Sequence, residues 1–377
     1  MSLDPVSLAQ ALIRCASVTP TDAGALGVAQ AALEKLGFRA KRYRFGAVDN
    51  LYARLGDAAP NFCFAGHVDV VPPGQGWSVD PFAAEVQGGM LIGRGAADMK
   101  SAIAAMIAAT DAFLATHGAP KGSISFLLTG DEEGPAIEGT KATLAAITAE
   151  GEKLDHCLVG EPTSEDKVGD IIKNGRRGSL NCVITIEGKQ GHVAYPQRAI
   201  NPVTPLLEAL SALKARVLDA GAPGFDPSNL EVTTIDVANS AHNVIPGRAS
   251  AKLNIRFNTA HTGEALLDWI IGTVTDAATR HGAKADVAVA SRSVPFYTEP
   301  GPFTNLMSEA VREAFGAAPK LSTSGGTSDA RYIKDFCPVA ELGLRNATAH
   351  MVDEAVAVED IRALSKCYEA VLVRYFA

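Results

Sequence analysis

The chain lacks the features that mark several large classes of proteins. It has six cysteines but no C-x-x-C pair. Neither a disulfide framework nor a thiolate metal site is therefore expected, and the cysteines are interpreted as buried free thiols of a cytosolic protein. Lys and Arg (34) are fewer than Asp and Glu (42), and basic residues form only short pairs such as Arg176-Arg177. Nucleic acid and anionic membranes are accordingly not expected as partners.

The sequence also has little that indicates targeting or membrane insertion. The stretch Pro5–Cys15 is amphipathic and has neither a basic segment nor a long apolar segment, so no signal peptide is expected. The longest apolar helical stretch, Met99–Ala109, is too short to span a bilayer. With 47% hydrophobic and 20% charged residues, the composition is that of a globular protein. We therefore expect a cytoplasmic location.

The length of 377 residues favours two domains. Apolar strands alternate with helices up to about residue 177, and a β-α-β-β-α-β order then follows. The first pattern returns with a helix predicted over 303–315. The sequence thus predicts an α/β catalytic domain over 1–177 and 293–377, with a mixed sheet flanked by helices. An inserted ferredoxin-like α+β module is predicted over 178–292.

The most informative stretch runs from Phe62 to Pro73. Its apolar strand ends in His67 and Asp69, whose side chains point to the same face because strand residues alternate faces. Burying two unpaired polar groups is costly. One explanation is a metal ion, with His67 as ligand and Asp69 beside or behind it. The alternative, a hydrogen-bonded pair at a strand end, remains open from this stretch alone.

Further acidic residues follow other strands. Asp98 ends a glycine-rich turn, Glu132 and Glu133 follow a buried strand, and Glu161 follows the next one. Each has an ordinary alternative, such as a helix N-cap for Asp98 or a solvated loop for the two glutamates. Sites in open α/β sheets form outside the carboxyl ends of the strands. The coincidence of these segments favours one site for metal binding or acid–base chemistry.

These motifs resemble those of the zinc-dependent aminoacylase/carboxypeptidase family of metallopeptidases, in which two metals share a bridging aspartate. The resemblance covers essentially the whole chain in order. The matching segments are Gly66–Pro72, Gly93–Lys100, Asp131–Gly134, Gly160–Thr163, Gly191-His192 and a late histidine, His350.

The resemblance implies a role for each of these residues. His67, Asp98 and Glu161 would hold one Zn²⁺, and Asp98, Glu133 and His350 would hold a second, with Co²⁺ as a possible substitute. Asp69 would accept a hydrogen bond from the far nitrogen of His67. Glu132 would be the general base for an attacking water. His192 of the partner subunit would stabilise the oxyanion, which implies a homodimer; the alternative is a surface histidine.

The family resemblance also predicts a polycarboxylate substrate, a succinyl amide of an amino diacid. It rests on the segments Arg176–Ser179, Gly191–Pro196 and Ser324–Arg331. The predicted substrate contacts are Arg177, Arg256, Tyr195, Asn243, Gly325, Gly326, Thr327, Ser328 and Asn346.

Three other functions compete with this one. A deacylase of another N-acyl amino acid, such as N-acetylornithine, stays an alternative. A catalytically dead binding protein would have lost Glu132 or a ligand, and none is lost. A dinucleotide fingerprint over Gly93–Asp98 is rejected because its third glycine is missing.

Overall fold

The computed structural model describes residues 3–377, which form two compact units. The first unit runs to Asn174 and resumes over Thr298–Ser322 and Ser328–Ala377. The second comprises Gly175–Tyr297 together with Thr323–Thr327. Each unit has its own apolar core. The predicted inserted module, 178–292, lies within the second unit, whose bounds are slightly wider.

The first unit is built around a mixed sheet of eight strands in the order β1-β2-β6-β3-β7-β18-β8-β17. Its strands are β1 (Arg39–Phe45), β2 (Val48–Leu55), β3 (Asn61–His67), β6 (Ser123–Thr129), β7 (His156–Val159), β8 (Ile171–Lys173), β17 (Lys320–Ser322) and β18 (Val339–Glu341). Its helices are α1 (Pro5–Ile13), α2 (Ala25–Lys35), α3 (Ser101–His117), α4 (Thr140–Ala149), α7 (Pro302–Phe315), α8 (Ala330–Ile333) and α9 (Val358–Phe376). The predicted α/β class is confirmed.

The central strands place the polar residues at one edge of this sheet. Every residue of β3 and β6 is buried, as expected for strands covered on both faces. β3 pairs in parallel with both β6 and β7, and His67 lies opposite Thr129. The carboxyl ends of these strands therefore meet, and the chain leaves them at Val68, Gly130 and Gly160.

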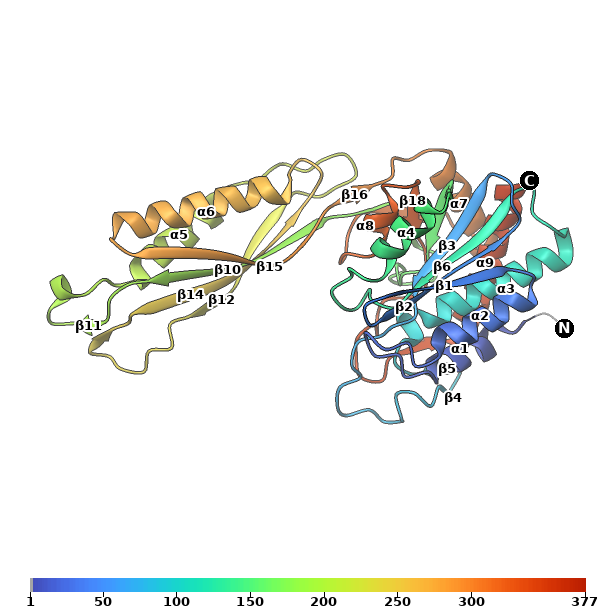
Figure 1. Ribbon diagram of the computed structural model, residues 1–377, viewed down its shortest axis with the longest axis horizontal. Coiled ribbons are helices and arrows are strands. Elements are labelled where there is room, and N and C mark those ends of the chain that lie inside the picture. The colour runs from blue at the N-terminus through green and yellow to red at the C-terminus, as the bar shows by residue number, and fades with distance from the viewer. Residues whose placement is uncertain (1–2) are drawn as a thin grey trace. The chain divides into compact units, whose positions relative to one another are not determined.

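Helices cover both faces of the sheet (Figure 1), and α3 is the most deeply buried of them. α3 and α9 pack against each other, while α4 and α8 lie on the other side of β3 and β6. Together with the turn η1 (Ala96–Lys100), α3 forms the one described helix long and apolar enough to cross a membrane. It is longer than the predicted Met99–Ala109 stretch, and 72% of its apolar window is buried inside the structure.

The second unit has the predicted β-α-β-β-α-β order. Its sheet runs β12-β14-β10-β15, with antiparallel neighbours throughout. The elements are β10 (Gly178–Glu187), α5 (Val203–Ala215), β12 (Asn229–Asp236), β14 (Arg248–Phe257), α6 (Gly263–Arg280) and β15 (Lys284–Ser293). Two short strands, β11 (Gly191–His192) and β13 (Val244–Ile245), pair with each other. Another pair joins β9 (Gly175–Arg176) to β16 (Phe296–Tyr297).

A small sheet connects the C-terminal part of the first unit to the glycine-rich turn. Its strands are β4 (Glu85–Gln87), β5 (Met90–Ile92) and β19 (Ala355–Ala357), in the order β19-β5-β4. β19 follows His350, and β5 leads directly to the turn that carries Asp98. Two segments far apart in the sequence are thereby held side by side.

Candidate metal centre

The first group of possible ligands comprises His67, Asp98 and Glu161. Their ligand atoms lie within 4.8 Å of one another. His67 Nε2 is 3.2 Å from Asp98 Oδ1 and 3.7 Å from Glu161 Oε1. All three side chains are largely buried. The structure thus brings together residues that leave β3, the glycine-rich turn and β7, as the sequence predicts.

The second group comprises Asp98, Glu133 and His350. His350 Nε2 lies 2.8 Å from Glu133 Oε1 and 3.2 Å from Asp98 Oδ2. Asp98 therefore presents one carboxylate oxygen to each histidine. It does not cap a helix, because Lys100 occupies the N-cap position of α3 and no side-chain cap hydrogen bond is present there. The N-cap alternative for Asp98 is wrong.

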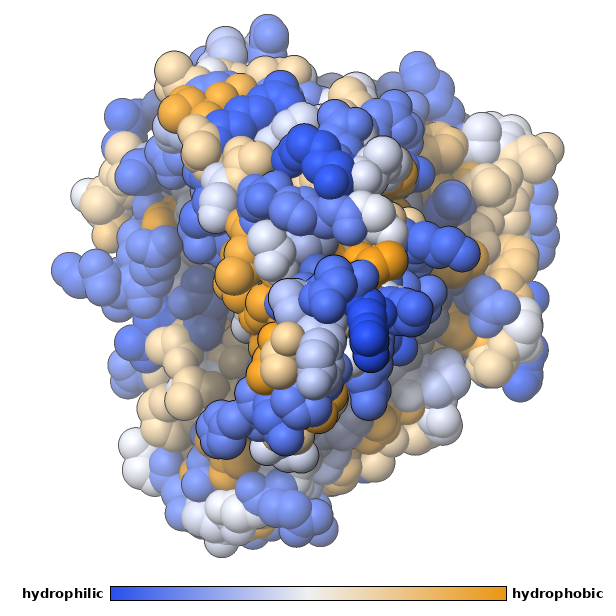
Figure 2. All heavy atoms as spheres, turned by 90° about the vertical axis from the view of Figure 1, so that its left-hand side faces the viewer, coloured by the Kyte–Doolittle hydropathy of each residue, from blue (hydrophilic) through white to orange (hydrophobic). Residues whose placement is uncertain are grey.

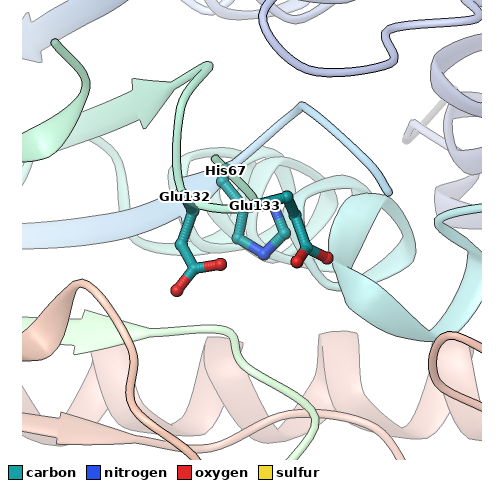
Figure 3. Close-up of side chains that lie close together, drawn as sticks. All are labelled: His67, Glu132 and Glu133. Atoms are coloured by element: carbon teal, nitrogen blue, oxygen red, sulfur yellow. The ribbon is translucent and has the colours of Figure 1, made fainter. Parts of the chain in front are cut away.

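The donor sets fit metal ions. Each group offers imidazole nitrogen and carboxylate oxygen within 4.8 Å, the ligand types that Zn²⁺ takes in proteins. Sharing of Asp98 between both groups is what a bridging carboxylate requires. A third group, His67 with Glu132 and Glu133, is drawn in Figure 3, where the two carboxylates flank the imidazole ring.

The His67 ring is oriented by its neighbour, though not by the predicted atom. Nδ1 lies 2.9 Å from the main-chain carbonyl oxygen of Asp69, and 3.6 Å from its carboxylate. A carbonyl only accepts, so Nδ1 donates to it and Nε2 is the nitrogen that faces Asp98 and Glu161. In the metal-free protein a protonated Nε2 donates to Asp98, and the same nitrogen would be free to bind a metal ion once deprotonated. We predicted the carboxylate of Asp69 as the acceptor. The backbone takes that role because the chain leaves β3 after His67 in a conformation that places the Asp69 carbonyl against the ring.

The Asp69 carboxylate instead holds the acidic loop. It accepts hydrogen bonds from the main-chain N–H groups of Glu132, at 3.4 Å, and Glu133, at 3.1 Å. It also accepts from the Thr19 hydroxyl at 2.5 Å. Since Asp69 is almost wholly buried, these donors compensate its charge. Sequence reasoning missed Thr19, and no pattern near it indicates this contact.

The pKa values of several groups at this edge of the sheet are shifted from their usual values. The surrounding protein shields the Glu132 carboxyl from bulk water and raises its pKa to about 8. Hydrogen bonds to Asp98 and Glu133 raise the pKa of His350 to about 10. Burial opposes charge on His67, but the neighbouring carboxylates outweigh it and raise its pKa. Burial likewise opposes ionisation of Asp98, yet hydrogen bonds from both histidines lower its pKa.

Several predicted residues lie in the second unit. His192 pairs with Val244, and the N–H of Val193 donates to the carbonyl of Asn243 at 3.2 Å. The N–H of Ala194 donates to His192 Nδ1 at 3.0 Å, which leaves the Nε2–H of the neutral ring as an exposed donor. The Tyr195 ring lies 5.8 Å from the His192 ring, measured between centroids. The structure therefore groups His192, Tyr195 and Asn243.

The two predicted carboxylate clamps lie close together in the same unit. Arg177 donates to Asn229 Oδ1 at 3.1 Å, and Asn229 is the strand partner of Arg256. Burial lowers the pKa of Arg256, and the charge of Arg177 lowers it further. Two neighbouring guanidinium groups of this kind are suited to an anion.

The glycine-rich stretch near residue 325 is divided between the units. Gly325, Gly326 and Thr327 belong to the second unit, where Arg176 donates to the Gly326 carbonyl at 3.0 Å. Ser328 belongs to the first unit and is buried with its hydroxyl against Glu341. The following helix, α8, has only four residues, which is too short to form an anion site at its N-terminus.

Asn346 and a missed residue lie near His350. Asn346 is exposed, and its N–H donates to the Ser164 carbonyl at 3.0 Å. Glu354 is fully buried beside the Asp98 turn. The only sequence signal for Glu354 is an acid directly before the alternating stretch Ala355–Val358, which is too weak to have singled it out.

The comparisons with known proteins agree with this geometry. Residues 63–374 match the model of Peptidase family M20/M25/M40. The chain belongs to this peptidase family. Succinyl-diaminopimelate desuccinylase from Maricaulis maris is 58% identical over 99% of this chain and 96% of its own length. The protein of the same name from Caulobacter vibrioides is 58% identical over 100% and 97%. The resemblance stated from the motifs is confirmed.

Solved structures of M20 proteins share the fold. Aminopeptidase PepT from Bacillus cereus aligns with a TM-score of 0.81 and 20% identity, covering 98% of each chain. The YXEP protein from Bacillus subtilis, described as a dinuclear metal-binding peptidase of the M20 family, aligns with a TM-score of 0.73 and 16% identity. That alignment covers 99% of this chain and 98% of the other.

Proposed function

We propose that the chain is a two-metal amidohydrolase that cleaves N-succinyl-LL-2,6-diaminopimelate to succinate and LL-2,6-diaminopimelate. The observation that carries this proposal is the 58% identity, over 99% of the chain, to a protein named succinyl-diaminopimelate desuccinylase. The two candidate ligand groups that share Asp98 give the same chemistry a physical basis. The reaction belongs to lysine and diaminopimelate biosynthesis, and we place the protein in the cytoplasm.

The metal positions follow from the donor sets. His67, Asp98 and Glu161 would hold one Zn²⁺, and Asp98, Glu133 and His350 the other, with Co²⁺ able to replace zinc. Such a pair, when bound, supplies Lewis-acid polarisation of the amide carbonyl and a water that ionises near neutral pH.

Glu132 supplies the proton transfer. Its neighbour Glu133 faces His350, whereas Glu132 belongs to neither of the two groups that share Asp98. It is therefore free to take a proton from the attacking water and return it to the leaving amine. Burial raises the pKa of this carboxyl, so its ionised form is a stronger base than that of an exposed glutamate, which favours proton transfer from the water to the leaving amine.

Recognition and oxyanion stabilisation are assigned to the second unit. The neighbouring guanidinium groups of Arg177 and Arg256 are suited to substrate carboxylates. Tyr195, Asn243 and the backbone of Gly325–Thr327 in this unit, with Ser328 and Asn346 of the first unit, would complete the contacts. The Nε2–H of His192 is an exposed donor, and we assign it to the oxyanion in the active site of the partner subunit.

A homodimer follows from that assignment. The second unit carries exposed hydrophobic side chains that a partner would cover, among them Leu207, Ile235, Ile271 and Val289. Figure 2 shows apolar side chains among polar ones on the face that it presents. Exposed apolar groups of this kind favour a protein interface, although single ones are ordinary at surfaces.

A panel of N-acyl substrates tests the function. Metal-loaded protein should hydrolyse N-succinyl-LL-2,6-diaminopimelate with a kcat/KM well above that for N-acetylornithine. A higher kcat/KM for the acetyl compound would overturn the desuccinylase assignment in favour of another N-acyl amino acid deacylase. Metal analysis on the same preparation shows whether turnover follows the bound metal.

A further inference from the structure

Glu354 has a fully buried carboxylate group that accepts hydrogen bonds from the main chain of one turn. Its Oε2 accepts from the N–H of Gly95 at 2.9 Å, and its Oε1 accepts from the N–H groups of Ala97, at 2.7 Å, and Asp98, at 3.0 Å. Arg94 Nη1 adds a fourth donor to Oε2 at 2.8 Å. The side chain thus fixes the backbone of the turn from which Asp98 projects.

The main chain of Glu354 binds the same turn. Its carbonyl accepts from the N–H of Gly93 at 2.9 Å, which extends the pairing of β19 with β5. Glu354 lies four positions after His350, and the loop between them is closed by two hydrogen bonds between Thr348 and Ala355. One residue therefore joins the segment of His350 to the turn of Asp98.

Arg94 reinforces this junction. Its guanidinium is 3% exposed and pairs with a carboxylate that is 0% exposed. It also donates to the Pro73 carbonyl at 3.2 Å and stacks over the Trp77 ring at 5.2 Å. Arg94 accordingly compensates the charge of Glu354 and ties the junction to the loop after β3.

We propose that Glu354, compensated by Arg94, is a positioning residue that sets the distance between Asp98 and His350, and thereby the affinity of the metal position that these two residues share with Glu133. This inference rests on the proposed two-metal function. The affinity of the other metal position should fall less, because His67 and Glu161 are held at the ends of β3 and β7. Glu354 belongs to none of the candidate ligand groups among the described residues and acts through Asp98 and His350.

The hydrogen bonds at Glu354 explain why its neutral isostere, glutamine, cannot replace it. Each oxygen of Glu354 accepts two hydrogen bonds. In Glu354→Gln the amide NH₂ must face two of these donors whichever way the group is turned, since it accepts none. Glu354→Asp keeps the charge and four acceptor sites but is shorter by one CH₂.

Titration of the metal-free protein with Co²⁺ tests the proposal. Isothermal calorimetry and the visible Co²⁺ spectrum should show two sites in the wild type. In Glu354→Gln one of the two dissociation constants should rise about 10- to 100-fold, with a smaller rise for the other and an intermediate effect in Glu354→Asp. Two wild-type dissociation constants in either variant would overturn the proposal.

Glu152→Gln is the matched control. Glu152 also accepts two donors, Arg54 Nη1 at 2.6 Å and the Tyr52 hydroxyl at 2.9 Å, and it lies near Asn61 at the opposite end of β3. It should lower stability without changing Co²⁺ affinity. If Glu152→Gln weakened Co²⁺ binding as much as Glu354→Gln does, the role of Glu354 would be structural in general, and the proposal would be overturned. Absence of two sites in the wild type would instead refute the two-metal function itself.

Discussion

At the scale of single residues, Asp69 shows how one side chain serves two segments. Its carbonyl aims His67, while its carboxylate holds the backbone of Glu132 and Glu133. The candidate ligand from β3 and the proposed general base, Glu132, are therefore positioned by the same residue. Sequence reasoning linked Asp69 to His67 but not to the acidic loop, because the loop follows β6 and only the parallel pairing of β3 with β6 brings the two together.

Asp69→Asn should reduce kcat by about 10- to 100-fold while leaving the fold intact. The asparagine amide would face either the N–H of Glu133 or that of Glu132, so the loop must move. Thr19→Val, which removes only one donor to the same carboxylate, should change kcat by less than a few-fold. Steady-state kinetics of both variants check this. Similar kcat values for the two would mean that the carboxylate does not position the loop.

His350 gives a pH dependence to the stability of the metal-free protein. Its pKa rises from 6.5 to about 10 on folding, so the folded state binds the proton more tightly than the unfolded state. The resulting stabilisation is fully present below pH 6.5 and is lost as pH rises through about 10. The stability advantage of wild type over His350→Gln should therefore shrink across this range, as measured by urea unfolding in EDTA.

Saturating Zn²⁺ supplies the control for this prediction. A metal ion held by His350 and its carboxylate neighbours would take the place of the proton, so the metal-loaded protein should not lose stability over the same pH range. An equal decline with and without Zn²⁺ would show that other groups cause it.

At the scale of elements, the candidate site could be predicted because most of its candidate ligands lie at or shortly after the end of a recognisable strand or turn. His67 ends β3, Glu133 and Glu161 follow β6 and β7 within four residues, and the glycine-rich turn marks Asp98. Glu354 could not be found in this way, since its importance arises from the pairing of β19 with β5, more than 250 positions apart in the chain.

The end of β7 is packed so tightly that glycine is required beside it. A Cβ on Gly343 would lie 2.2 Å from the carbonyl oxygen of Glu161 and 2.5 Å from that of Gly160. Both are backbone atoms, which cannot swing aside as a flexible side chain does. Gly343→Ala should therefore destabilise the fold by about 1–3 kcal/mol and displace Glu161, which lowers the amount of bound metal.

Gly272→Ala in α6 is the comparison for this change. A Cβ on Gly272 meets no atom within 4 Å, and helical alanine is favoured over glycine by about 0.5–1 kcal/mol. Urea unfolding should show opposite signs for the two variants, and only Gly343→Ala should lose metal. A stable, metal-saturated Gly343→Ala would contradict the packing argument.

At the scale of the whole molecule, the chain forms two units, each with its own apolar core and each containing some of the predicted site residues. The candidate ligands and Glu132 belong to the first unit, and His192, Tyr195, Asn243, Arg177 and Arg256 to the second. The order β-α-β-β-α-β was readable from alternation and turns. The assembly of the chain could not be predicted from these patterns, because a surface that a partner covers has no periodicity of its own. Exposed side chains such as Leu207 and Ile271 look like scattered surface residues.

The dimer proposal makes a prediction that a single-chain active site does not. Glu132→Ala and His192→Ala should each abolish most turnover as homodimers. In a heterodimer of the two variants, one active site would combine an intact Glu132 with the intact His192 of the partner subunit. Heterodimers isolated with two different affinity tags should therefore recover roughly half the wild-type rate per dimer.

If His192 instead served the active site of its own chain, each site of that heterodimer would contain one of the two substitutions, and turnover would not recover. The comparison must be made at a protein concentration where the dimer persists, checked by light scattering on the same samples. Recovery thus depends on the exchange of His192 between subunits and not on stability alone, since both homodimers carry the same substitutions and remain inactive.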